Sequence, residues 1–506
     1  MVSEIKNSWK DLTGLWCSQA LSLPLAVFYI SMIARNLGPQ QWGTLTLAMA
    51  VCQLLYAALI SWTASSIVRF GKDELLQEGN LRNTVNARMI MMIAAFIFAL
   101  FLFLINKEKL IVITGLPEKT LFYLLIMFIA YSISDHYSWI LKACGRMKHF
   151  AISTLVRQGM LLLILIAYFI FSFKLSVNRV ILMEIVAYVS VIIFSSFFIR
   201  FESIYPCVTS GKYIGNILKY SYPMIAVFLL GYAVNWMDVF FIKHYLSLTH
   251  VGVYQTAYRL LEYIRTPLYG IPIIAFPALM AVKSKGKSDI INFYVQKIIP
   301  QLASIWLCLI IIVIGISPEI IFGIFGKSYF DAAWPLTILL SGLAFQMIAL
   351  MYTSIFAVFD LLYINTIVIF IGCIVNALGD IILIPHFGIS GAAIATSISC
   401  LAVAIAYIIS GTHKLGIKNS MRLLPFAIII ITLAVVCSRL SFVARVASEG
   451  ALLFVCFYYI KRSNIFNSRD LIELEKIDMP LIIRSGIKYL YVCFTPTGAR
   501  QESNIK

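Results

Sequence analysis

The chain has 506 residues, of which 61% are hydrophobic and 12% are charged, and its mean hydropathy is +0.91. Soluble domains carry about 25% charged residues, so this composition excludes an ordinary soluble or secreted enzyme. The net charge of +17 would suit a nucleic-acid ligand only if the positions of the basic residues left no other explanation.

Apolar stretches recur along nearly the whole chain. A membrane-spanning helix needs about 20 mostly apolar residues, and the stretches are longer and more continuous than the alternating strands of a β-barrel. The first is read as a retained helix rather than a signal peptide, because it is long and a second span follows at once. The sequence predicts fourteen spans, of which the last two are short: Leu12–Ala34, Trp42–Val68, Met89–Ile105, Leu121–Leu141, Thr154–Phe171, Val180–Ile199, Tyr220–Phe241, Val251–Met280, Ile298–Ile316, Ala333–Val358, Leu361–Ile384, Ile389–Ser410, Leu423–Ser438 and Val446–Ile460.

The basic residues follow the positive-inside rule. With a cytoplasmic N-terminus, the inner loops carry roughly twice as many Lys and Arg as the outer loops, when Arg88 and Arg157 are counted with the inner loops. This bias explains most of the charge without nucleic acid. It predicts an even number of spans, with both termini in the cytoplasm.

Several classes of chemistry have no support in the sequence. The ten Cys form no CxxC pair, and the six His form no metal-binding cluster, so the sequence predicts neither a disulfide framework nor a metal site. No P-loop is present. The loops are too short for a soluble catalytic domain. We therefore expect a protein that is not an enzyme and holds no cofactor.

A faint internal repeat divides the chain. The segment LGPQQWGTLTLA (Leu37–Ala48) aligns with LSLTHVGVYQTA (Leu246–Ala257), so that Gly43 corresponds to Gly252; FKLS at Phe173 and FGIS at Phe387 align at nearly the same offset. Such repeats build many secondary transporters. The predicted organisation is an N-terminal six-helix lobe over 1–200, a C-terminal six-helix lobe over 201–411, an extra helix pair over 412–462, and a cytoplasmic or membrane-surface tail over 463–506.

The eighth predicted span contains the densest group of intramembrane charges. Arg259, Glu262 and Arg265 recur at steps of three and so occupy neighbouring helix positions. Charged groups in spans are costly and are functional candidates. A guanidinium binds phosphate through paired hydrogen bonds, which predicts a site for a phosphate-bearing substrate; the alternative is a self-neutralised ladder that packs the halves together.

Other polar residues are weaker candidates. Tyr258 could stack on a sugar ring, and Arg35 could admit an anionic headgroup or reach the interface as a snorkelling side chain. Asp238 is a candidate for ion coupling or for a structural ion pair, and Asp135 with His136 for a proton relay or a wet helix kink. Glu184 and Asp380 are single buried acids.

Prolines interrupt the spans that would line a cavity. Pro24 and Pro223 fall in the first span of each predicted lobe, and Pro267 interrupts the eighth. Because proline breaks the helical hydrogen-bond ladder, these are candidate bending points for gating, and harmless kinks are the alternative.

Four stretches carry a family resemblance: ARNLGPQQWGTLTLAMA (Ala34–Ala50), GRMK (Gly145–Lys148), SYPMIAVFLLGYAVNWMDVFFIKHYLSLTHVGVYQTAYRL (Ser221–Leu260) and LIPHFGISGAAIATSIS (Leu383–Ser399). They resemble Wzx-type O-antigen flippases of the multidrug/oligosaccharidyl-lipid/polysaccharide exporter superfamily. The resemblance implies an all-α polytopic membrane fold of about fourteen helices, with two pseudo-symmetric lobes around a central cavity.

The resemblance also implies an activity. We expect a flippase that moves undecaprenyl-pyrophosphate-linked oligosaccharide across the bacterial inner membrane by alternating access, coupled to an H⁺ or Na⁺ gradient. The expected partners are the lipid-linked oligosaccharide, membrane lipids, and the polysaccharide polymerase and chain-length machinery. Three alternatives stay open: a multidrug exporter, a peptidoglycan-precursor lipid flippase, and a membrane-embedded glycan polymerase or ligase.

Overall fold

The computed structural model describes residues 2–199, 210–284, 288–416, 423–463, 465–467 and 491. These residues form helices connected by short turns, without a strand among them. Eleven of the described helices are long and apolar enough to cross a membrane, and Leu423–Cys437 is a shorter apolar helix. The predicted all-α polytopic membrane class is therefore confirmed. Most of the predicted tail, 463–506, lies outside the described residues.

The chain divides into two compact units. The first comprises Met1–Tyr263, Ile321–Ala332 and Asp380–Ala392, and the second comprises Ile264–Ile320, Ala333–Gly379 and Ala393–Lys506. This division does not test the predicted lobe boundaries, which stay a prediction.

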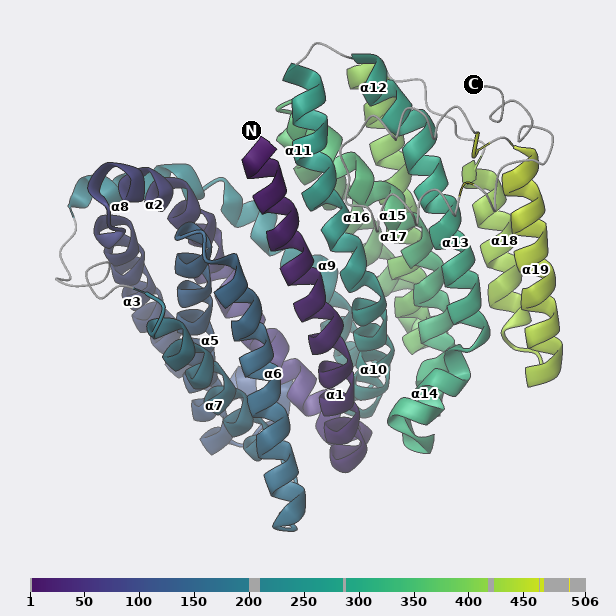
Figure 1. The fold of residues 1–506 in the computed structure, drawn as a ribbon. Coiled ribbons are helices and arrows are strands. Elements are labelled where there is room, and N and C mark those ends of the chain that lie inside the picture. The colour runs from purple at the N-terminus through teal and green to yellow at the C-terminus, as the bar shows by residue number, and fades with distance from the viewer. Residues whose placement is uncertain are drawn as a thin grey trace. The chain divides into compact units, whose positions relative to one another are not determined.

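The first unit consists mainly of α1 to α10. In it α5 packs on α7, α7 packs on α6, and α1 packs on α6 and α9; Figure 1 shows α3, α5, α6 and α7 running side by side. The helices are α1 Val2–Leu59, α2 Ala64–Glu78, α3 Arg82–Ile105, α4 Lys107–Thr114, α5 Glu118–Ala143, α6 Met147–Ile170, α7 Val177–Ser196, α8 Gly211–Ser221, α9 Met224–Tyr245 and α10 Leu248–Arg265.

The second unit is centred on α13, which contacts α15, α18 and α19 (Figure 1). Its helix α15 is deeply buried along most of its length, whereas α19 buries little of its apolar surface. The remaining helices are α11 Gly270–Ser284, α12 Ser288–Phe293, α13 Ile299–Gly315, α14 Ser317–Phe325, α15 Ala333–Val358, α16 Leu362–Phe387, α17 Ile389–Leu415, α18 Leu423–Cys437 and α19 Phe442–Arg462.

The predicted spans and the observed helices differ at several places. The second span, Trp42–Val68, is broken by the 3-10 turn Ser61–Thr63 between α1 and α2, and the seventh, Tyr220–Phe241, is broken between α8 and α9. The first span and most of the second form one long helix, α1, interrupted at Gly38, whose φ of 73° lies in the left-handed region that glycine tolerates. The eighth span is broken: α10 ends at Arg265, a 3-10 turn covers Thr266–Tyr269, and α11 follows. Pro267 in that turn lacks the N–H that a continuous helix would use.

The two repeat segments lie against each other at their glycines. A Cβ on Gly43 would lie 1.9 Å from the Leu248 carbonyl oxygen, and a Cβ on Gly252 would lie 2.0 Å from the Pro39 carbonyl oxygen. Pro39 and Leu248 are themselves equivalent positions of the repeat. The contact is therefore reciprocal, and only glycine allows α1 and α10 to approach so closely.

This contact predicts that Gly43→Ala lowers stability. The added methyl group must push α1 and α10 apart, at a cost of about 1–3 kcal/mol. Gly159→Ala in α6 is the matched control, because a Cβ there meets no atom within 4 Å. Thermal unfolding of the purified proteins in detergent compares the two variants. Equal melting temperatures would contradict the close contact.

Candidate substrate-binding site

An ion pair on α10 is the centre of the predicted site. Arg259 Nη1 lies 2.8 Å from Glu262 Oε2, one helical turn further along, as the spacing of three predicts. The guanidinium also lies over the ring of Trp236 on α9, 5.1 Å from its centroid. Both charged side chains remain partly exposed, at 21% and 28%. The pair therefore neutralises much of its own charge and keeps an accessible edge.

Arg265 is the last residue of α10 and belongs to the second unit. Its side chain is buried, and its guanidinium lies 5.5 Å from the ring centroid of Tyr269. Six residues separate it from Arg259, about 9 Å along a helix axis, and this spacing places the two on different helix faces. The predicted anion-binding role of the two arginines stays a prediction.

Polar residues of α9 and α10 extend this region. The Tyr258 hydroxyl donates to Asn235 Oδ1 at 3.1 Å, and the Tyr254 hydroxyl donates to the carboxylate of Asp238. The carboxyl of Asp380 lies near enough to that of Asp238 for the two to interact electrostatically, its oxygens make no hydrogen bond among the described residues, and both acids are buried in the first unit. Asp380 is thus one half of an acidic pair rather than a single buried acid.

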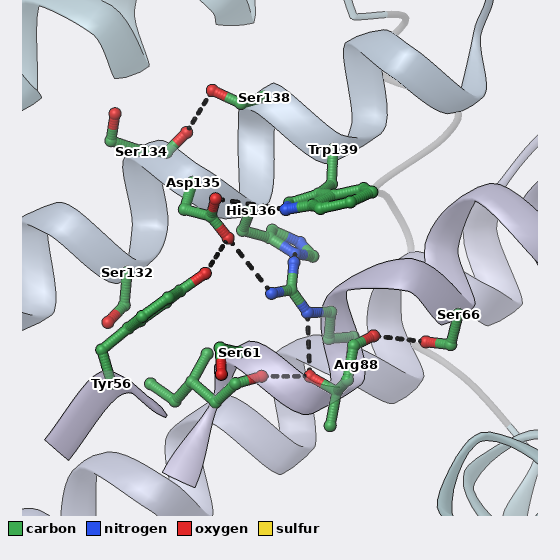
Figure 2. A network of polar contacts seen from close by, with 12 residues as sticks. Tyr56, Ser61, Ser66, Arg88, Ser132, Ser134, Asp135, His136, Ser138 and Trp139 are labelled. Atoms are coloured by element: carbon green, nitrogen blue, oxygen red, sulfur yellow. Dashed lines mark hydrogen bonds and ion pairs between the residues drawn. The ribbon is translucent and has the colours of Figure 1, made fainter. Parts of the chain in front are cut away.

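Asp135 and His136 converge on a third residue, Arg88 (Figure 2). The Arg88 side chain is fully buried; its Nη2 lies 3.4 Å from Asp135 Oδ2, and its Nη1 lies 3.1 Å from His136 Nδ1. Arg88 Nε donates to Thr63 Oγ1 at 3.0 Å, in the short 3-10 helix Ser61–Thr63. The network therefore joins α3 and α5 to the break that follows α1.

The same network fixes the state of the histidine. A guanidinium can only donate hydrogen bonds, so His136 Nδ1 must accept, and the ring is neutral with its proton on Nε2. That Nε2 is buried without a hydrogen-bond partner among the described residues. Asp135 also accepts from the Tyr56 hydroxyl and from Trp139 Nε1, so its carboxylate is well satisfied. The geometry shows a structural junction, and a proton relay through these residues stays a prediction.

A second ion pair, between α6 and α7, is not among the sequence predictions, which place Arg157 with the basic residues of the inner loops. Arg157 lies within α6, and its Nη2 is 2.6 Å from Glu184 Oε2 on α7. The guanidinium stacks over the ring of Tyr188, 4.8 Å from the centroid, and Tyr29 donates its hydroxyl to Glu184 Oε1 at 3.3 Å. The available signal was its position inside the predicted span Thr154–Phe171.

Arg35 contacts backbone rather than charge. Its Nε donates to the Ile324 carbonyl at 2.9 Å, and its Nη2 donates to the Gly323 carbonyl. These carbonyls end α14, where cations are favoured by unpaired backbone oxygens and the helix dipole. The Tyr329 hydroxyl makes a parallel bond to the Ala34 carbonyl at 2.7 Å. Arg35 thus holds α14 against the end of the first span.

The predicted bending prolines occupy three different settings. Pro24 lies inside α1, where only Gly38 departs from helical geometry. Pro223 is the N-cap of α9, where its missing N–H is not needed. Pro267 lies in the 3-10 turn between α10 and α11. Their part in gating stays a prediction.

Comparison with known proteins assigns the chain. Its sequence matches the family described as polysaccharide biosynthesis protein over residues 8–282. The chain belongs to this family. The resemblance seen in the sequence is therefore confirmed, and more than half of the chain carries it.

This chain is similar to the probable low-salt glycan biosynthesis flippase Agl15 of Haloferax volcanii, with 26% identity over 194 residues. The match covers 38% of this chain and 40% of that protein, so the chain matches less than half of the relative's length.

The fold is shared with solved transporters. The lipid II flippase MurJ in an inward closed conformation superposes with a TM-score of 0.66 at 15% identity, over 90% of this chain and 99% of MurJ. An inward-facing MATE family multidrug transporter of the MOP superfamily gives 0.63 at 15% identity, over 78% of this chain and 94% of that one. At such identities the likeness concerns the fold alone.

Within the described residues, no group of three or more His, Cys, Asp or Glu is arranged to hold a metal ion.

The buried junction predicts a large stability loss for Arg88→Leu. Removing one partner of a buried ion pair leaves the other charge uncompensated and costs about 3–5 kcal/mol. Lys109→Ala, at an exposed position in α4, is the control and should change stability by less than about 0.5 kcal/mol. The melting temperature of each purified variant measures the effect. If the melting temperature of Arg88→Leu equals that of the wild type, the junction does not stabilise the fold.

Proposed function

We propose that this protein is a flippase that moves undecaprenyl-pyrophosphate-linked oligosaccharide repeat units across the bacterial inner membrane, for O-antigen, capsule or exopolysaccharide synthesis, by alternating access. The family match and the transporter fold support glycan export across a membrane. The observation that carries the proposal is the partly exposed guanidinium of Arg259 on α10, which lies over the ring of Trp236 on the apolar helix α9. An intramembrane cation that keeps access to water is typical of a substrate pathway.

The chemistry suits a pyrophosphate headgroup. Arg259 and Arg265 are each a candidate cationic partner for the headgroup, and a guanidinium stays charged at every physiological pH. Two parallel N–H donors match two phosphate oxygens. The isoprenoid tail can remain in the lipid while the headgroup and glycan cross. No covalent step is required, so the protein acts as a transporter rather than an enzyme.

Three alternatives differ in chemistry. A multidrug exporter of cationic compounds would favour an acidic binding site, which the arginines oppose. A peptidoglycan-precursor flippase shares the anionic headgroup, and the likeness to MurJ in fold keeps it as the second candidate. A membrane-embedded glycan polymerase or ligase would form new glycosidic bonds with purified protein. The polymerase and chain-length machinery are instead proposed as partners, and both termini are proposed to be cytoplasmic.

We also propose that transport is coupled to an H⁺ or Na⁺ gradient through the Asp238–Asp380 pair. Two buried carboxylates that lie close together repel each other unless a cation is bound between or on them. A proton or a sodium ion relieves this repulsion, so occupancy by the ion changes the energy of the helices that carry the pair. Tyr254 fixes the orientation of Asp238.

For the anion site we expect Arg265→Ala to abolish surface polysaccharide while the protein still reaches the membrane. Lipid-linked repeat units should accumulate, because the headgroup loses a cationic partner. Arg179→Ala, at an outer loop end, is the control and should leave export unchanged. Extracted polysaccharide and membrane immunoblots measure both variants. Normal polysaccharide with Arg265→Ala would remove this residue from the site.

For coupling we expect Asp380→Asn to slow flipping and to remove its dependence on the ion gradient. The neutral amide keeps the size of the side chain and cannot carry a titratable proton or a negative charge. Flipping in vesicles is followed with a proton gradient, with a sodium gradient and with each dissipated by an ionophore. Undiminished, gradient-dependent flipping by Asp380→Asn would exclude the acidic pair as the coupling site.

A further inference from the structure

Aromatic rings surround the Arg157–Glu184 ion pair on the first unit's helices. The ring of Tyr188 contacts that of Tyr131 on α5, with centroids 5.3 Å apart, and Tyr131 contacts Tyr56, with centroids 4.7 Å apart. Arg157 both stacks on Tyr188 and donates to its hydroxyl at 3.3 Å. A row of three tyrosine rings therefore ends at a guanidinium–carboxylate pair.

The cluster faces away from lipid. On α6 the exposed apolar residues Ile152, Leu163 and Ile166 lie roughly 180–240° around the helix from Arg157, at about 100° per residue. The Arg157 side chain is nevertheless 29% exposed. This side of α6 packs against α1 and α7, which carry Tyr29 and Glu184. The cluster therefore lies among the helices of the first unit, and its arginine keeps part of its surface exposed.

The charge of the pair indicates which ligand it suits. Glu184 neutralises Arg157, so the cluster carries no net charge and gives an anion no advantage. Arg157 Nε is buried and makes no hydrogen bond among the described residues, whereas other parts of the Arg157 side chain remain exposed. A sugar hydroxyl donates and accepts at once, and the C–H face of a pyranose packs on an aromatic ring.

We propose that Arg157, Glu184, Tyr131 and Tyr188 form a subsite for an uncharged sugar ring of the transported glycan. The inference rests on the proposed function, since it assumes that a glycan crosses here. Tyr263 on α10 interacts electrostatically with both the Arg157–Glu184 pair and the Arg259–Glu262 pair. The proposed subsite therefore lies near the proposed anion site. A sugar next to the pyrophosphate can therefore rest on the tyrosines while the phosphates engage Arg259.

Site-specific photocrosslinking tests the subsite in cells that make the polysaccharide. A benzoylphenylalanine probe replaces Tyr188, Tyr258 or Leu163 in turn, and mass spectrometry of the crosslinked peptide identifies adducts by hexose or N-acetylhexosamine fragments. The probe at Tyr188 should yield sugar-bearing adducts. Leu163, on the same helix as Arg157 and 64% exposed, is the control and should yield membrane-lipid adducts without sugar.

The outcomes separate this inference from the proposed function. Isoprenyl-pyrophosphate adducts at position 258 with sugar-free adducts or none at position 188 would overturn the subsite and leave the flippase intact. Sugar-free results at both positions, without any isoprenyl-pyrophosphate adduct, would overturn both.

A pair of substitutions distinguishes ligand binding from a purely structural role. Tyr188→Phe keeps the ring and should retain export, whereas Tyr188→Leu should reduce export about tenfold, the loss expected for one stacking contact. Both variants should reach the membrane in equal amounts. Equal export by the two variants would contradict a stacking role for the ring.

Discussion

Charge inside an apolar helix bundle is the constraint on which the rest of this structure depends. A guanidinium cannot release its proton and is costly to bury unpaired, so each one within the spans must find a carboxylate, a carbonyl or an aromatic face. Arg88 forms an ion pair with Asp135, Arg157 with Glu184, and Arg259 with Glu262. The first two pairs connect different helices and so fix their register, whereas the third joins two residues of the same helix, α10.

The exposure of these arginines divides them by role. Arg88 is fully buried and donates a hydrogen bond to Thr63 in the turn after α1, so its role is to hold the helices together. Arg157 and Arg259 are partly exposed and stack on Tyr188 and Trp236. An accessible guanidinium beside an aromatic face is equipped to bind a ligand that carries both phosphate and sugar. The proposed anion site and sugar subsite follow from this difference.

Much of the fold could be predicted from the sequence because the bilayer imposes a local rule. Each apolar stretch of sufficient length must form a helix, so the spans were found without tertiary information. The Arg259–Glu262 pair follows from its spacing of three, and Gly43 and Gly252, which the repeat makes equivalent, turn out to lie against each other. These features depend on neighbours along one helix or on internal repetition.

The contacts between helices could not be predicted in the same way. The sequence places Arg88 just before and Arg157 just inside the start of a predicted span, with the basic loop residues, although both lie within helices and their partners, Asp135 and Glu184, lie on other helices. Asp380 looked isolated because Asp238 is far away in the sequence. Such pairs depend on which helices touch and in which register, and a single sequence without tertiary packing does not specify either.

The most direct measurement of the central claim is flipping by the purified protein in liposomes. The liposomes contain the lipid-linked repeat unit extracted from the source cells, and an added glycan-oxidising reagent that cannot cross the bilayer reports which leaflet holds it. The account predicts that the protein exposes the inner-leaflet half of the substrate within minutes, and that Arg259→Gln does so far more slowly. If half of the substrate stays protected with the wild-type protein under an imposed gradient of either ion, the protein is not a flippase for this substrate.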